Sequence, residues 1–155
     1  MKLTPLLLAL LVAATASLQG CVTPTRTFIV EKQVAASSEN TLWETLLLSI
    51  KRSGYGYGIG ADSGKREVVS NWKNDLAPYK GKGFRTRVIA NYEPAENAGE
   101  GLLGYDVTIR VEKQTNESYR SLDLTYAKWE PADDDAATAR LVMQNLQALL
   151  GTLEL

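Results

Sequence analysis

The sequence predicts an α+β domain in which an antiparallel sheet of about four to six strands packs on two helices, because a run of strands lies between two helices along the chain. Apolar and polar residues alternate strictly in 84–92 and 105–112, as in strands with one covered and one polar face. Two other segments carry apolar residues at the spacing of amphipathic helices. The predicted order is β-α-β-β-β-β-α.

The first strand and the first helix are expected within residues 28–54. In 28–34 the side chains of Phe28, Val30 and Val34 share one side. The stretch 41–44 has the pattern of a capping box, with Thr41 as the cap and Glu44 reaching back to it, so we expect the helix to begin there. A glycine at position 54 suits its end. Its apolar stripe consists of Leu42, Trp43, Leu46, Leu47 and Ile50.

Residues 55–72 predict a hairpin whose first strand is rich in glycine. The glycines permit bending or close packing, and they alternate with large apolar residues that are expected on one face. These are Tyr55, Tyr57 and Ile59. The stretch 62–65 has the composition of a turn, and in the second strand, 67–72, we expect Val68, Ser70 and Trp72 on one face. A phosphate-binding loop is excluded, because the glycine spacing and the residue after Lys65 both break its pattern.

The segments 74–83 and 93–104 are predicted loops that flank the alternating strands. A weaker alternation at 122–126 indicates either a further strand or an irregular approach to the last helix. Pro131 and the acidic run 133–135 suit the start of that helix, and we interpret the run as solvated charge that compensates the helix dipole. The helix is expected to end at Gly151, with the apolar residues Leu141, Val142, Leu146, Leu149 and Leu150.

Residues 1–20 have the build of a secretory signal peptide, because Lys2 precedes an apolar run that is too short to span a bilayer. The sequence Leu-Gln-Gly-Cys at 18–21 resembles the lipobox of bacterial lipoproteins. That resemblance implies cleavage after Gly20, diacylglycerol on Cys21 and an acyl chain on its new amino group. In enteric lipoproteins, aspartate after the cysteine retains the protein at the inner membrane, so with Val22 at this position the resemblance implies the outer membrane. The expected organisation is a signal peptide (1–20), a lipidated linker (21–27), one domain (28–151) and a tail (152–155).

The composition removes several kinds of chemistry from the mature chain. The protein has no histidine, and its single cysteine is expected to carry lipid, which excludes thiol and imidazole nucleophiles, disulfides and the usual zinc ligand sets. Loss of Lys2 with the signal peptide leaves 16 basic beside 18 acidic side chains, a net charge of −2 that argues against nucleic acid. We expect no cofactor, no metal and no enzymatic activity, since the carboxylate pairs Glu93–Glu96 and Asp106–Glu112 show no controlled separation.

Three short stretches carry a further similarity: Val-Val-Ser-Asn-Trp at 68–72, Arg-Val at 87–88 and Val-Glu-Lys-Gln at 111–114. Together with the order of elements over 28–150, they resemble the helix-grip domains of BamC-type lipoproteins, accessory members of the machinery that inserts outer-membrane β-barrels. The resemblance implies a helix-grip fold and a role in barrel assembly. This chain has one such domain rather than two, and it lacks the long extended segment that precedes them in the family.

Basic residues outnumber acidic ones by seven to two between positions 64 and 90, in a chain that is otherwise acidic. The candidate residues for binding an anionic membrane surface or an acidic protein partner are Lys65, Arg66, Arg85, Arg87 and Arg110. The alternative is a pair of solvated hairpins whose lysines protect a sheet edge from aggregation.

The three tryptophans, Trp43, Trp72 and Trp129, are interpreted as core packing, with a ligand cavity between helices and sheet as the alternative. The sequence therefore predicts a lipid-anchored module on the periplasmic side of the bacterial envelope that binds a protein partner or supports assembly. An exposed strand edge is one means of binding an extended partner. The alternative function is a carrier of a small apolar or anionic ligand, such as a lipid.

Overall fold

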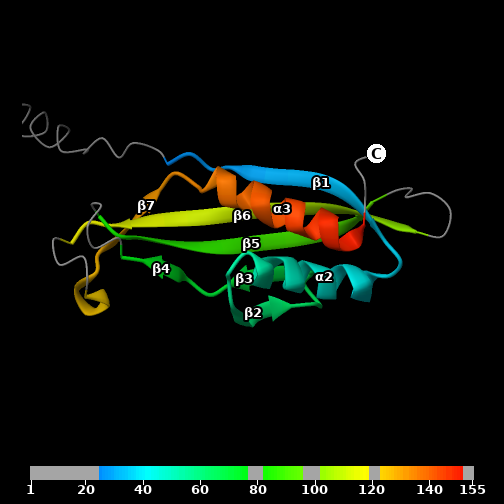
Figure 1. The fold of residues 1–155 in the computed structure, drawn as a ribbon, viewed down its shortest axis with the longest axis horizontal. Helices are drawn as coiled ribbons and strands as arrows, with labels where there is room; N and C mark the ends of the chain where they lie inside the picture. Colours follow the sequence, from blue (N-terminus) through cyan, green and yellow to red (C-terminus); the bar gives the residue numbers. More distant parts are fainter. Residues whose placement is uncertain (1–24, 77–81, 96–101, 119–122, 152–155) are drawn as a thin grey trace, which may run out of the picture.

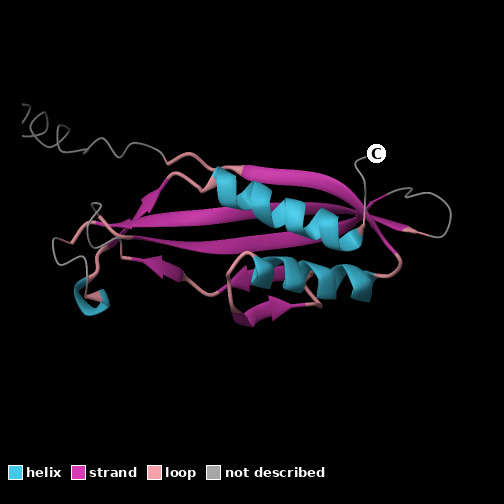
Figure 2. Ribbon diagram, in the orientation of Figure 1, coloured by secondary structure: helices cyan, strands magenta, loops and turns pink. Residues whose placement is uncertain are grey.

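The computed structural model describes residues 25–76, 82–95, 102–118 and 123–151. They form a seven-stranded antiparallel sheet with two helices on one of its faces (Figures 1 and 2), which confirms the predicted α+β class. In chain order the elements are β1 (Ile29–Ala36), α2 (Glu39–Arg52), β2 (Tyr57–Asp62), β3 (Glu67–Ser70), β4 (Lys73–Asp75), β5 (Phe84–Ala95), β6 (Leu103–Asn116), a 3-10 turn (Leu124–Tyr126), β7 (Trp129–Ala132) and α3 (Ala136–Leu150).

The long strands β5 and β6 form the centre of the sheet, whose order is β1-β6-β5-β3-β2. Two short strands extend it at one end, where β4 pairs with β5 and β7 pairs with β6. They make the sheet one strand larger than expected. The three residues of β4 are all exposed, and two of them fall in the segment 74–83 that the sequence predicts as a loop, because so short a strand shows no alternation.

The first helix begins two residues before the predicted cap. Ser38 has an extended backbone, and its hydroxyl accepts a hydrogen bond from the backbone N–H of Thr41 at 3.1 Å, so Ser38 is the N-cap. Thr41 lies within the first turn, and the predicted capping box is wrong because the helix already begins at Glu39, before the box. The apolar stripe is correct: Leu42, Leu46 and Ile50 are fully buried, and Trp43 and Leu47 pack against them.

The last helix ends as predicted at Gly151, which adopts the left-handed conformation at φ 67°. Its N-cap is Asp135, whose carboxylate accepts from the backbone N–H of Thr138 at 3.0 Å. The buried face is Ala139, Val142, Met143 and Leu146, whereas Leu141 is 48% exposed. Leu141, one of the apolar residues expected in this helix, therefore lies outside the buried face, which includes Ala139 and Met143 instead.

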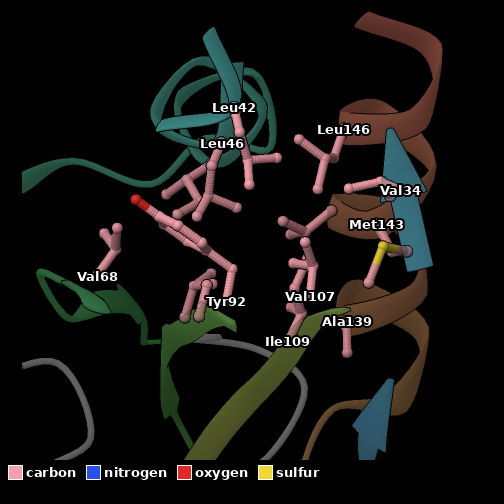
Figure 3. Packing of buried hydrophobic residues seen from close by; sticks show 14 of the residues in the cluster. Val34, Leu42, Leu46, Val68, Tyr92, Val107, Ile109, Ala139, Met143 and Leu146 are labelled. Carbon is pink, nitrogen blue, oxygen red and sulfur yellow. The ribbon is translucent and has the colours of Figure 1, made fainter. Parts of the chain in front are cut away.

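The core lies between the helices and the covered face of the sheet (Figure 3). Strands β5 and β6 contribute the alternating residues that the sequence predicts, among them Val88, Ala90, Val107, Ile109 and Val111, all without exposed surface. Tyr92 and Tyr105 meet edge to face, with ring centres 5.8 Å apart. Burial of each large aliphatic side chain stabilises the fold by about 1.5 to 3 kcal/mol.

The glycine-rich segment is a strand, but its large residues do not share a face. Tyr55 is buried, and its hydroxyl lies 2.8 Å from that of Thr86, whereas Tyr57 is half-exposed and Ile59 is fully exposed. The pairing of β2 with β3 is irregular between Tyr57 and Ala61, which breaks the alternation. A Cβ at Gly60 would lie 2.2 Å from the carbonyl oxygen of Val69, so close packing of strands requires that glycine.

Candidate functional site

The sheet face opposite the helices, here called the open face, carries the polar half of each alternating strand. Arg85 and Arg87 on β5 lie beside Gln114 and Glu112 on β6, in register with them. Arg110 follows one position along the same face of β6, opposite Ile89. Both helices of the described chain lie on the other face (Figure 1). The structure thus brings three of the five candidate cations together on one helix-free surface.

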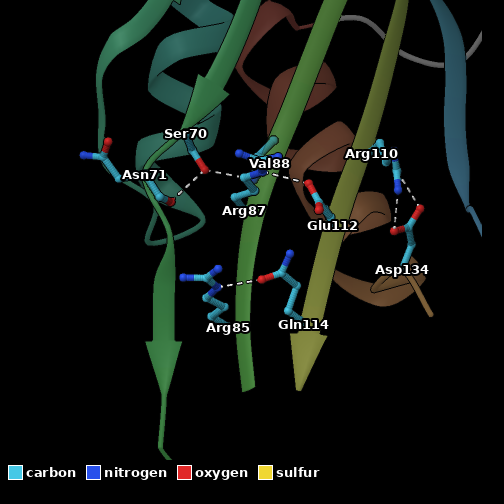
Figure 4. Close-up of polar contacts among 9 residues, drawn as sticks. All are labelled: Ser70, Asn71, Arg85, Arg87, Val88, Arg110, Glu112, Gln114 and Asp134. Carbon is cyan, nitrogen blue, oxygen red and sulfur yellow. Dashed lines mark hydrogen bonds and ion pairs between the residues drawn. The ribbon is translucent and has the colours of Figure 1, made fainter. Parts of the chain in front are cut away.

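A bulge between β3 and β4 turns Trp72 onto the open face. Val69 pairs with Ile89 but Lys73 pairs with Thr86, so three residues on one strand oppose two on the other. The extra residue reverses the side on which Trp72 points. Ser70 completes the bulge, because its hydroxyl accepts from the Val88 N–H at 2.8 Å and donates to the Asn71 carbonyl at 3.0 Å (Figure 4).

The stacked patch consists of Trp72, Arg85, Arg87 and Trp129. The guanidinium carbon of Arg85 lies 4.3 Å from the ring centre of Trp72 and 4.7 Å from that of Trp129. The guanidinium carbon of Arg87 lies 4.6 Å from the Trp72 ring. The two indoles approach Arg85 from opposite sides of β5, one from beside β4 and one from β7. Each contact contributes about 0.5 to 2 kcal/mol.

Polar neighbours fix both guanidinium groups by their Nε atoms. Arg85 Nε donates to the amide oxygen of Gln114 at 2.8 Å, and Arg87 Nε donates to the Glu112 carboxylate at 2.7 Å (Figure 4). Burial lowers the pKa of Arg85, and the neighbouring Arg87 charge lowers it further. The partner of Arg85, Gln114, is neutral, whereas the partner of Arg87, Glu112, carries a negative charge. The two guanidinium groups and the one carboxylate therefore have a net charge of +1.

Arg110 is neutralised by the acidic run before α3. Its Nε lies 2.7 Å from Asp134 Oδ2, whose side chain is only 2% exposed and also accepts from the Phe28 N–H at 2.9 Å. The hydrogen bond that Arg110 donates to Asp134 is the main cause of the raised pKa of Arg110. The predicted solvated run is therefore wrong at this position, because Asp134 ties the start of β1 to β6 instead of compensating the helix dipole.

Lys65 and Arg66 lie at the turn between β2 and β3, away from the stacked patch. Arg66 Nε lies 2.7 Å from Glu39 at the start of α2, and Lys65 lies 3.6 Å from Asp62. The hydrogen bond from Arg66 lowers the pKa of Glu39, which also accepts from the Tyr92 hydroxyl at 3.2 Å. The five candidate cations therefore do not form one patch, and these two have acidic partners.

The interpretation of all three tryptophans as core packing holds only for Trp43, which packs beside Tyr92 with ring centres 6.3 Å apart. Sequence alternation pointed Trp72 inwards, and gave no sign that Trp129 would join it. Asn71, a residue uncommon within strands, was the available signal of an interruption. The layer between helices and sheet, where a carried ligand would lie, is filled by buried side chains (Figure 3).

The outer edge of β1 is a second candidate surface. The carbonyl of Arg26 and the N–H of Phe28 both bond to Asp134, on the side of β6. Backbone groups alternate in direction along a strand, so the N–H and C=O groups that point away from the sheet are those of Ile29, Glu31, Gln33 and Ala35. Within the described chain, β1 pairs with β6 alone.

A groove of about 390 Å³ runs beside this edge, between β1 and α3. Residues 28–32 line one wall, and Arg140, Met143, Gln144 and Gln147 line the other. Arg140 lies over the ring of Phe28, 4.8 Å from its centre. The groove thus offers an apolar strip with polar side chains above it, next to unpaired backbone groups.

The candidate lipidation and cleavage residues, Cys21 and Gly20, lie outside the described residues, as does Glu96. Asp106 and Glu112 lie on one strand about 20 Å apart, and Glu112 is held by Arg87. Neither helix in the described ranges is long and apolar enough to cross a membrane. No group of three potential metal ligands occurs among these residues.

Comparison with models of known protein families finds none that matches the chain, and comparison with curated proteins finds no significant match.

Proposed function

We propose that the protein is a lipid-anchored, non-enzymatic interaction module of the bacterial envelope that binds an extended segment of a protein partner along β1. The observation that carries the proposal is the outer edge of β1, which no other strand of the described chain pairs, beside the groove of α3. Strand addition joins backbone hydrogen bonds, which supply affinity, to a neighbouring groove, which supplies specificity. The lipobox resemblance supports the anchor, and Cys21 is its attachment point.

The edge and the groove would act on the same bound segment. A strand added to β1 bonds to the outward groups of Ile29, Glu31 and Gln33, and its alternate side chains enter the groove over Met143. The resemblance to BamC-type lipoproteins makes a component of outer-membrane protein assembly the first partner to seek. A carrier function would instead require the helices to separate from the sheet, because side chains fill that layer.

A single proline tests the proposal. The N–H of Gln33 points out of the sheet, so Gln33→Pro removes one bond to the added strand and leaves the ladder with β6 intact. A photoreactive residue at Ile29, which is 53% exposed, reports the partner by crosslinking in cells. We expect the crosslinked adduct to form when residue 33 is the original Gln33 and in the matched control Gln33→Ala. The adduct should be lost in Gln33→Pro.

An adduct that persists in a folded Gln33→Pro variant rejects strand addition on this edge. Circular dichroism checks the fold, and a photoreactive residue at the exposed Leu141 of α3 controls for random contact. Identification of a barrel-assembly protein in the adduct would support the family resemblance.

A further inference from the structure

The terminal nitrogens of the stacked arginines are unoccupied. Gln114 and Glu112 engage only the Nε atoms, and within the described chain no other hydrogen-bond acceptor reaches Arg85 or Arg87. Trp72 contacts both guanidinium groups and Trp129 contacts that of Arg85, so two fork-shaped donor ends remain available on the open face. Such forks match the oxygens of a phosphate or carboxylate.

The stacked patch lies at the end of the sheet where the chain enters from its N-terminus (Figure 1). The N–H of Arg26 donates to Asp133 at 2.8 Å, directly after β7, and Ala132 of β7 pairs with Lys113. The neighbouring residue on β6, Gln114, holds Arg85. Two strand spacings, about 10 Å, therefore separate the chain entry from the patch.

An anchor at Cys21 would hold this patch close to the bilayer. Four residues lie between Cys21 and Arg26, and the five steps from one Cα to the next span at most about 18 Å. Tryptophan and arginine are both favoured at a membrane surface, where indoles lie at headgroup level and guanidinium groups meet lipid phosphates. The tether also makes the contact intramolecular, so that weak binding suffices, whereas an acidic protein partner would have to supply its own affinity.

We propose that Arg85 and Arg87, held by Trp72 and Trp129, bind the phosphate groups of anionic phospholipids and orient the open face towards the membrane. The inference rests on the proposed lipid anchor but not on strand addition at β1. Each basic residue near an anionic surface strengthens binding about fivefold, so the pair changes the ratio of docked to undocked domains about thirtyfold.

Tryptophan fluorescence measures the docking directly. The full-length lipidated protein is reconstituted in vesicles of phosphatidylcholine, with or without phosphatidylglycerol, that carry brominated acyl chains as quenchers. We expect stronger quenching in the vesicles with phosphatidylglycerol, and loss of that difference in the double variant Arg85→Gln, Arg87→Gln. The matched control, Lys51→Gln with Arg52→Gln, removes two exposed charges from α2 and should keep the difference.

Each other outcome overturns the inference. Equal quenching in both lipids, or an unchanged difference in a folded Arg85→Gln, Arg87→Gln variant, rejects phosphate docking. Displacement of the signal by a soluble polyglutamate peptide, without dependence on lipid, assigns the patch to an acidic protein partner instead. If the protein does not float with the vesicles, it lacks the lipid anchor, and the docking proposal fails with the anchor. The crosslinking test at β1 is decided separately.

The variant Arg85→Lys, Arg87→Lys keeps the charge and should retain only part of the quenching difference between the two lipid compositions.

Discussion

The two faces of the sheet belong to the same strands but are stabilised in different ways. On the covered face of β6, Val107, Ile109 and Val111 have no exposed surface and belong to the core between the sheet and the helices. On the open face of the same strand, Arg110 and Glu112 are partly exposed, and each is held by one particular partner. One face is fixed by burial and the other by pairing.

This difference decides how changes on each face propagate. Apolar burial has no direction and scales with area, so an alternating pattern is sufficient to place a side chain in the core. A charged pair requires two residues to meet at one register, and a single bulge is enough to change which residues meet. The covered face should therefore govern stability, and the open face should govern recognition.

The largest expected effect comes from adjacent residues of β6 that point to opposite faces. Ile109→Ala removes fully buried volume and should lower the free energy of unfolding by about 2 to 5 kcal/mol. Thr108→Val, on the half-exposed open face, should change it by less than about 0.5 kcal/mol. Urea unfolding followed by circular dichroism measures both. Similar losses for the two variants would break the contrast between the faces.

A second test uses Tyr92, a titratable residue of the covered face whose hydroxyl donates a hydrogen bond to Glu39. Burial, followed by the charge of Glu39, raises the pKa of Tyr92 to about 12. A pKa raised above the ordinary value of 10.0 means that the folded state keeps its proton longer than the unfolded chain. Stability should therefore be complete below pH 10 and fall by about 2 to 3 kcal/mol as the pH rises to about 12.

Unfolding measured at a series of alkaline pH values, with tyrosinate absorbance recorded in parallel, checks this dependence. Tyr92→Phe should flatten the decline, although Tyr55 and Tyr105, whose pKa values burial also raises, will contribute to what remains. An equal decline in Tyr92→Phe would show that Tyr92 titrates as an exposed group.

The contrast also explains how far the sequence could predict this molecule. Alternation correctly assigned the buried residues of 84–92 and 105–112, and helical spacing assigned Leu42, Leu46 and Ile50. The cap at Ser38 was missed because two hydroxyl residues three positions apart, Ser38 and Thr41, are both suitable N-caps ahead of the apolar stripe. Trp72 and Asp134 were missed because their environments depend on contacts with residues distant in sequence. Helix and sheet periods report burial, but they contain no information on which polar groups will meet.

The smallest expected effect concerns Ser70, which lies on the covered face at the bulge that turns Trp72 onto the open face. Ser70→Ala removes the hydroxyl that accepts from the buried Val88 N–H, and should cost about 1 to 2 kcal/mol in urea unfolding. Loss of that bond should also loosen the bulge that turns Trp72 outwards, which would weaken its stack on Arg85 and change the near-ultraviolet circular dichroism of the tryptophans.

The control variant Ser70→Thr keeps the hydroxyl and should retain the spectrum. A loss of stability in Ser70→Ala with an unchanged tryptophan spectrum would mean that the stack itself holds Trp72 on the open face and the bulge merely follows. In that case Arg85→Gln should release Trp72 in a chain whose Ser70 is intact. The two variants therefore separate backbone register from side-chain stacking as the cause of the open-face arrangement, since only the first acts through the Val88 hydrogen bond.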